Sequence, residues 1–193
     1  MTAPIRRRSP RATSGPAKVL LVDDRKDNLI ALAAILQGLP VEPVAVDSGT
    51  NALKQLLIDD FAVILMDAQM PQMDGFETAT RIKERERTRN VPIIFLTAAD
   101  HDAQLALRGY AAGAVDYLTK PLDPWVLRAK VAVFAELWTK TQQLAAQADI
   151  ATEAATLTAD VRTALDALSD LDKPDVETAV DVLRRALRRS DAD

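Results

Sequence analysis

The stretch Phe61–Glu77, FAVILMDAQMPQMDGFE, decides the fold of this chain. Its first six residues are apolar, the seventh is an acid, Asp67, and a proline, a second acid and a glycine follow soon after. An apolar run of this length fits a strand that is buried on both faces, as in a parallel sheet. Because open α/β sheets bind ligands beyond the carboxyl ends of their strands, Asp67 is a candidate functional residue. Taken alone, it could equally well serve a turn or cap a helix.

The same pattern extends in both directions from this stretch, because short apolar segments alternate with helical ones between residues 17 and 137. Strands are predicted at 18–22, 41–46, 61–66, 91–96 and 114–118, and helices at 28–39, 50–58, 76–87, 102–112 and from Pro124 onward. Five strand–helix units indicate an α/β fold with a doubly wound, flavodoxin-like parallel sheet of order 2-1-3-4-5.

Polar residues stand at the ends of four predicted strands, and the strand order brings them to one crevice: Asp23, Asp24, Asp67, Thr97 and Lys120. Three neighbouring carboxylates repel one another unless a cation compensates them. Oxygen ligands without His or Cys favour a hard ion, Mg²⁺ or Mn²⁺. Together with an ammonium and a hydroxyl, such a site suits a phosphoryl group, and a carboxylate can be its acceptor.

Each of these residues also has a purely structural interpretation. Asp23 or Asp24 could cap a helix, Thr97 could be an ordinary strand residue, and Lys120 could be a solvated charge. Their occurrence together, at successive strand ends, favours the functional interpretation. Asp74 is predicted to be a turn residue and not a ligand.

The fragments LLVDDR, ILMDAQMPQMDGFE, PIIFLTA and AVDYLTKP closely resemble the receiver domain of two-component response regulators, over residues 17–137. The resemblance implies that Asp67 accepts a phosphoryl group from the phosphohistidine of a sensor histidine kinase. It also implies that Asp24, Asp67 and the backbone carbonyl of Gln69 bind Mg²⁺ directly, and that Asp23 binds it through a water. Self-phosphorylation and self-dephosphorylation are the only chemistry expected of such a phosphoacceptor, which is not an enzyme in the usual sense.

The resemblance implies roles for the remaining strand ends as well. Lys120 and Thr97 would contact the phosphoryl oxygens, with the backbone N–H groups of Ala68 and Ala98 assisting. Tyr117 would be an aromatic switch that turns inward when Thr97 moves; a plain core position is the alternative for this residue.

Bulk properties limit the possible partners and locations. The chain has 193 residues, a formal net charge of -4 and no cysteine. The charge gives no general reason to expect nucleic-acid binding, and no apolar run approaches the roughly 20 residues of a membrane span. We therefore expect a cytoplasmic protein that binds neither membrane nor nucleic acid. Residues 1–16 are predicted to be a disordered basic tail.

Residues 138–193 are predicted to be a C-terminal helical extension. The helix that begins near Pro124 carries apolar residues at 4-3 spacing in two registers separated by a stutter. Neither Gly nor Pro interrupts it before Lys173. So long a stripe is predicted to pair with the same helix of a second chain, which gives a homodimer through residues 124–171. A stop signal at 172–175 and a last helix would complete a helical hairpin, or coiled coil, of this extension.

The sequence leaves three other functions to consider. Four arginines in the last helix favour, as an alternative, a receiver-regulated protein that binds DNA or RNA: Arg184, Arg185, Arg188 and Arg189. The sequence at the strand ends is also typical of the receiver part of a longer hybrid signalling protein. A phosphatase-type hydrolase would need a second acid two residues after its nucleophile, where this chain has Gln69.

Overall fold

The fold is taken from a computed structural model, which describes residues 15–97, 113–169 and 184. Four predictions lie wholly or mainly outside these residues. They concern the N-terminal tail, the helix at 102–112 with Ala98 before it, the C-terminal hairpin, and the terminal arginines apart from Arg184.

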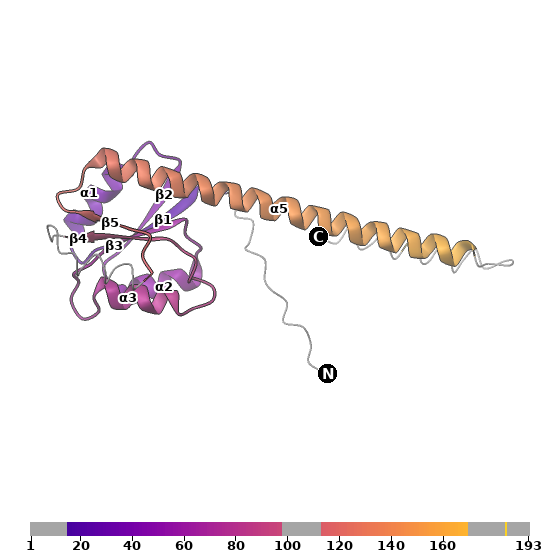
Figure 1. The fold of residues 1–193 in the computed structure, drawn as a ribbon, viewed down its shortest axis with the longest axis horizontal. Coiled ribbons are helices and arrows are strands. Elements are labelled where there is room, and N and C mark those ends of the chain that lie inside the picture. The colour runs from indigo at the N-terminus through magenta and orange to yellow at the C-terminus, as the bar shows by residue number, and fades with distance from the viewer. Residues whose placement is uncertain (1–14, 98–112, 170–183, 185–193) are drawn as a thin grey trace. The chain divides into compact units, whose positions relative to one another are not determined.

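A five-stranded parallel sheet of order β2-β1-β3-β4-β5 forms the core (Figure 1). The strands are β1 (Ala17–Val22), β2 (Val41–Val46), β3 (Val63–Asp67), β4 (Ile93–Thr97) and β5 (Asp116–Thr119). This result confirms the predicted fold class and strand order. The strand order changes direction at β1, so the carboxyl ends of β1 and β3 flank the topological switch point, where open α/β sheets bind their ligands.

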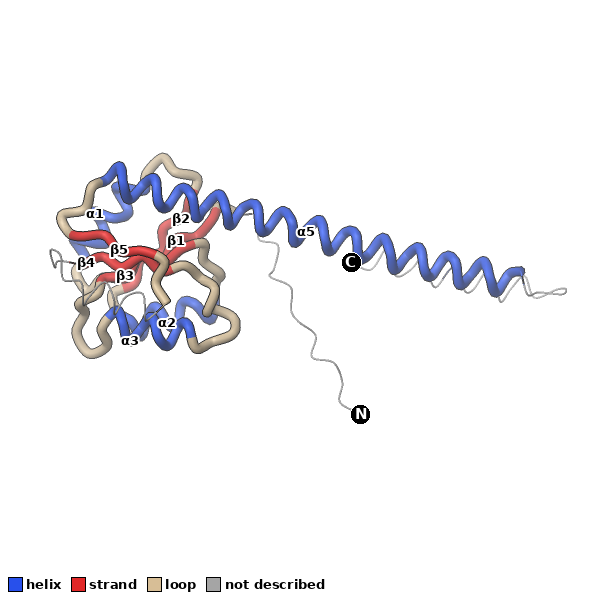
Figure 2. The backbone as a smooth tube through the Cα atoms, viewed as in Figure 1, coloured by secondary structure: helices blue, strands red, loops and turns tan. Residues whose placement is uncertain are grey.

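Helices cover both faces of the sheet (Figure 2). They are α1 (Lys26–Leu36), α2 (Gly49–Ile58), α3 (Gly75–Lys83) and α5 (Pro124–Ser169). Apolar residues of α1 and of the first turns of α5 pack on one face, and those of α2 and α3 pack on the other. All five residues of β3 are buried, which explains the apolar run before Asp67. Each large apolar side chain buried in this way contributes about 1.5–3 kcal/mol.

The helix α3 ends about one turn earlier than predicted. The Lys83 ammonium donates to the carbonyls of Arg89 and Val91, at 3.0 and 2.8 Å. The hydroxyl of the buried Thr88 donates to the carbonyl of Ile82 at 2.7 Å. The Thr88 hydroxyl thus satisfies a carbonyl that a further helical turn would have satisfied, and Lys83 satisfies carbonyls of the segment that leads to β4, so the chain turns toward β4 after Lys83.

The last helix, α5, runs without a break over 46 residues, or about 69 Å at ~1.5 Å per residue. Its start follows from Asp123, whose carboxylate accepts the N–H groups of Trp125 and Val126 at 2.8 and 3.4 Å. The chain divides into two compact units, and the boundary lies within α5, between Thr141 and Gln142.

One edge of the sheet is formed by β2, which has Pro43 in its interior, paired in register with Val19 of β1. A proline has no N–H to offer a further strand, and prolines within sheets are therefore largely confined to such edges. Within the described parts of the chain, no helix combines the length and the apolar character that a membrane crossing requires.

Candidate functional site

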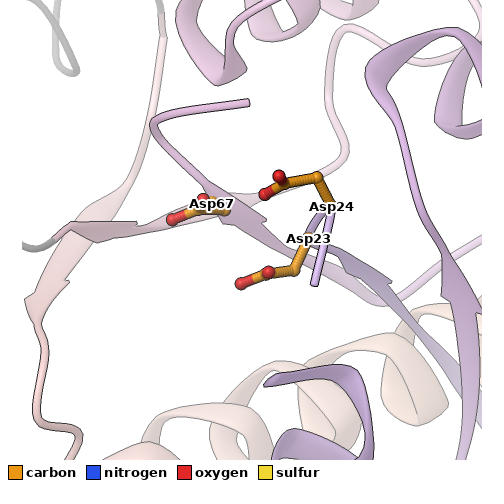
Figure 3. A group of neighbouring side chains, drawn as sticks. All are labelled: Asp23, Asp24 and Asp67. Carbon is orange, nitrogen blue, oxygen red and sulfur yellow. The ribbon is translucent and has the colours of Figure 1, made fainter. Parts of the chain in front are cut away.

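Three carboxylates meet where β1 and β3 end (Figure 3). The register pairs Val22 with Met66, so the residues that follow them, Asp23 and Asp67, lie on neighbouring strands at the same edge. One oxygen from each of Asp23, Asp24 and Asp67 lies within 4.8 Å of the others. The three acids converge as their positions at the strand ends predict, because parallel strands end at the same edge of their sheet.

The ammonium of Lys120 lies between two of these carboxylates. It donates to Oδ1 of Asp67 at 2.9 Å and to Oδ2 of Asp23 at 3.0 Å. The backbone helps to place it, since the N–H of Lys120 donates to the carbonyl of Thr97 at 2.7 Å and extends the pairing of β4 with β5. A side chain that follows β5 thus reaches the end of β3 across the end of β4.

One ammonium does not fully compensate three acids. Burial raises the pKa of the Asp67 carboxyl; Lys120 opposes this effect, and the charges of Asp23 and Asp24 add to it. Burial by itself would lower the pKa of Lys120, but its hydrogen bonds to Asp67 and Asp23, together with the charges of these two acids, outweigh burial and raise that pKa. The site therefore carries an excess of negative charge, which a further cation would relieve.

Asp23 and Asp24 differ in how the protein holds them. Asp23 is fully buried and accepts the N–H of Arg25 at 3.0 Å and the side-chain amide of Asn28 at 2.8 and 2.9 Å. Asp24 is exposed. Protein donors already occupy the oxygens of Asp23, and Asp24 faces solvent, so the two acids can take different parts in binding a cation.

Asn28 was missed in the sequence analysis. Its amide contacts both oxygens of Asp23 and so fixes the carboxylate from the first turn of α1. An amide residue five positions after the acid was the available signal. The sequence alone does not show that the first turn of α1 folds back over the end of β1.

The other predicted residues lie around this cluster. Thr97 is the last residue of β4 and is buried. It follows Leu96, which the register of the two strands pairs with Asp67 of β3. Gln69 is exposed in the loop two residues after Asp67. Tyr117 lies on β5 with 42% of its surface exposed. Asp74, predicted to be a turn residue, caps α3 by accepting the N–H of Glu77 at 2.7 Å.

One predicted donor is engaged within the sheet. The N–H of Ala68, which is predicted to assist at the phosphoryl group, donates to the carbonyl of Leu96 at 2.9 Å. The pairing of β3 with β4 thus continues one residue beyond Asp67. The role of Ala68 at a phosphoryl group stays a prediction, and it would require this N–H to leave the carbonyl of Leu96.

The chemistry of the donors fits the cation that was predicted. Carboxylate oxygens from two strand ends, with no nitrogen or sulfur ligand among them, suit Mg²⁺ or Mn²⁺ better than a softer metal. The excess negative charge of the three acids also favours binding of a cation. Asp24, Asp67 and the backbone at Gln69 are the groups that would hold such an ion, with Asp23 behind them.

Known proteins share this fold. The family model described as the response regulator receiver domain matches residues 19–132. The response regulator PleD from Caulobacter vibrioides is 36% identical over 115 residues, which cover 60% of this chain and 25% of PleD. The sensor histidine kinase GacS from Pseudomonas protegens is also 36% identical over 115 residues, which cover 58% of this chain and 12% of GacS. The chain thus spans a quarter or less of the length of these two relatives.

Solved structures agree with the sequence relatives. A putative response regulator from Chloroflexus aurantiacus is 32% identical, with a TM-score of 0.58 over 63% of this chain and 98% of that one. The chemotaxis protein CheY4 from Vibrio cholerae is 31% identical, with a TM-score of 0.57 over 61% of this chain and 97% of that one. The similarity covers the sheet and the helices around it.

Proposed function

Because this chain belongs to the response regulator receiver domain family, we propose that Asp67 accepts a phosphoryl group from a sensor histidine kinase in a two-component phosphorelay. The observation that carries the proposal is the position of the Lys120 ammonium, 2.9 Å from Asp67 and 3.0 Å from Asp23. It lies beside the proposed acceptor oxygen, where it can also meet the oxygens of an incoming phosphoryl group.

The proposed cofactor is Mg²⁺ or Mn²⁺, held by Asp24, Asp67 and the backbone carbonyl of Gln69, with Asp23 acting through a water. When bound, such an ion neutralises negative charge on the phosphoryl group during transfer. The rest of the chemistry falls to the side chains. A carboxylate oxygen of Asp67 attacks phosphorus, the P–N bond to the donor imidazole breaks, and its electron pair stays on the imidazole nitrogen.

The acyl phosphate on Asp67 would then draw in the donors beside it. Lys120 would move its hydrogen bond to a phosphoryl oxygen, and the Thr97 hydroxyl would donate to another. Movement of Thr97 would leave room for Tyr117, which is partly exposed here, to turn inward. Such a switch requires the phosphoryl group to favour one of two arrangements by a few kcal/mol.

The decisive experiment is labelling by a small phosphodonor such as acetyl phosphate with Mg²⁺, followed by intact mass spectrometry. We expect Asp67→Asn to abolish labelling, and EDTA to abolish it in the unmodified protein. Asp74→Asn is the matched control, since Asp74 caps α3 seven residues later and asparagine caps a helix equally well. Undiminished labelling of the Asp67 variant would place the acceptor elsewhere.

We also propose that the output is a protein interaction through α5, with a second copy of the chain as the partner. Two residues of the first predicted apolar register, Leu127 and Val131, are buried and pack on the sheet. A different stripe along α5 is exposed, and its members share two positions of one heptad: Val126, Val133, Leu137, Leu144, Val161 and Leu165. Between Leu144 and Val161 its two positions hold Gln147, Ala151, Ala154 and Thr158, and the exposed Ile150 and Leu157 lie outside its register. A two-fold dimer would therefore bury large apolar side chains mainly toward the two ends of the stripe.

A further inference from the structure

The first residue of α3 lies directly against the backbone of the proposed phosphoacceptor. A Cβ atom at Gly75 would lie 2.2 Å from the carbonyl oxygen of Asp67 and 3.0 Å from Cα of Ala68. The N–H of Gly75 also donates to the carbonyl of Ala68, at 3.1 Å. Since the obstructing atoms belong to the backbone, the end of β3 and the start of α3 must move together.

A second close approach joins α3 to α2. A Cβ atom at Gly49, the first residue of α2, would lie 2.1 Å from Oγ1 and 3.2 Å from Cβ of Thr78. Thr78 is fully buried, and its hydroxyl donates to the carbonyl of Asp74 at 2.8 Å. A branched, buried and hydrogen-bonded side chain has no easy alternative rotamer. The start of α2 therefore fixes the first turn of α3.

The two close contacts are linked through the chain, because the carbonyl that accepts the Thr78 hydroxyl belongs to Asp74, which directly precedes Gly75. We infer that Gly49 and Thr78 are positioning residues for Asp67, acting through Gly75 although neither belongs to the carboxylate cluster. Contact thus passes from α2 to α3 and from α3 to the end of β3. The effect on metal binding rests on the proposed function, whereas the effect on the backbone around Asp67 does not.

The side chain of Met73 adds a second connection at the same point. A Cβ atom at Gly49 would lie 3.1 Å from its sulfur, and Met73 belongs to the loop that carries Gln69. A methionine side chain can move aside at little cost. The rigid obstacle is therefore Thr78, and the inference can be tested by changing that residue together with Gly49.

The experiment begins with Gly49→Ala. The added methyl group must displace Thr78 and, with it, the turn that holds Asp67. Because residues that support metal ligands typically change metal affinity by ~10–100-fold, we expect Mg²⁺ to bind at least about tenfold more weakly. Isothermal titration with Mg²⁺ measures this change, at a temperature where circular dichroism shows the variant to be folded.

A compensating change separates this contact from general damage. Thr78→Ala removes Oγ1, so the double variant Gly49→Ala/Thr78→Ala should bind Mg²⁺ as well as Thr78→Ala alone. Thr78→Val keeps a methyl group where the hydroxyl was, so Gly49→Ala/Thr78→Val should stay impaired. If Gly49→Ala alone does not fold, the comparison of the two double variants still decides. Equal affinities in both double variants would overturn the inference.

A second readout needs no metal. In ¹H–¹⁵N spectra recorded in EDTA, Gly49→Ala should shift the amide signals of Asp67, Ala68 and Gly75. In the double variant Gly49→Ala/Thr78→Ala, these signals should lie close to their positions in Thr78→Ala alone. Unchanged amide signals at Asp67 and Ala68 would refute the positioning role. Absence of Mg²⁺ binding by the unmodified protein would instead refute the proposed function, and the amide signals would still test the contacts.

Discussion

At the scale of single residues, the site is defined by three carboxylates, two of which share one ammonium. Asp67 is buried beside Asp23 and Asp24, and burial raises the pKa of its carboxyl despite the hydrogen bond from Lys120. An ionised Asp67 therefore costs folding free energy in the absence of a further cation. Such local cost is common where a site is shaped for a ligand and not for stability.

The cost predicts a pH-dependent stability difference for Asp67→Asn. Because the folded-state pKa lies above the ordinary value of 3.8, ionisation of Asp67 destabilises the fold fully only above the folded-state pKa. That cost fades as pH falls through the folded-state pKa and is absent below the ordinary value. In EDTA at pH 7 we expect the variant to melt a few degrees higher than the unmodified protein.

Thermal unfolding at a series of pH values measures this difference. The gain should shrink steadily on acidification and disappear in the most acidic samples. A variant that melts at the same temperature as the unmodified protein at pH 7, or below it, would show that the charge of Asp67 is already compensated.

Sequence patterns predicted much of the site, for a geometric reason. Asp23, Asp24, Asp67 and Lys120 follow strands, and parallel strands deliver their ends to one edge whatever the details of packing. The contacts of Asn28, Ala68 and Gly49 could not be predicted in this way. They depend on how closely helices approach their neighbours and on how far the pairing of two strands continues. Residue types alone indicate neither.

At the scale of elements, the first turns of α5 are tied to the rest of the sheet unit on two sides. Arg128 donates to the carbonyls of Ile35 and Gln37 at the end of α1, the latter at 2.6 Å. Lys130 forms an ion pair with Asp116 of β5. These contacts add to the packing of Leu127 and Val131 and hold the first turns of α5 against the sheet.

Loss of the Arg128 contacts should weaken the fold. The last carbonyls of a helix have no partner within it, and the guanidinium supplies one for α1. We expect Arg128→Ala to lower the free energy of unfolding by about 1–3 kcal/mol. Urea unfolding followed by circular dichroism measures the change.

Lys140→Ala serves as the comparison, because Lys140 forms an exposed pair with Glu136 one turn away, worth at most ~1 kcal/mol. The interpretation of Arg128 as a cap for α1 does not survive if both variants unfold at the same urea concentration as the unmodified protein.

Element types were easier to predict than element ends. The apolar pattern placed every described strand, yet β4 begins at Ile93 and β5 at Asp116, each two residues later than predicted. Pro92 has no N–H for the ladder, and side chains of Lys83 and Thr88 close the turn before it. Such tertiary contacts decide where an element ends, and periodicity does not report them.

At the scale of the whole molecule, the chain joins two compact units through one helix. The family match covers residues 19–132, so the far part of α5 lies beyond it. Among the described residues, the part of the chain that lies beyond the family match is the continuation of α5 with most of its exposed stripe. The proposal of a dimer applies to that surface.

Two substitutions on the stripe should act in opposite directions. Leu144→Glu places a charge among apolar neighbours and should shift the protein toward the monomer. Lys140→Leu replaces a charged member of the same heptad register and should tighten association. Thr139→Glu, on another face of α5, is the control and should leave the mass unchanged. Light scattering coupled to size-exclusion chromatography, over a range of protein concentrations, reports the mass in each case.

A single mass for all four proteins, monomeric at every concentration, would rule out association through this stripe. Dimers that persist in Leu144→Glu and are not tightened by Lys140→Leu would point to a different surface. The measurement thus distinguishes the proposed interface from dimerisation elsewhere.

The proline within β2 affects whether a strand of another molecule can pair with this edge of the sheet. Pro43 interrupts the row of donors along that margin of the sheet, so a strand from a neighbouring molecule would find an incomplete template there. Growth of cross-β fibrils from this edge is therefore disfavoured, and the proposed association of copies through α5 does not involve it.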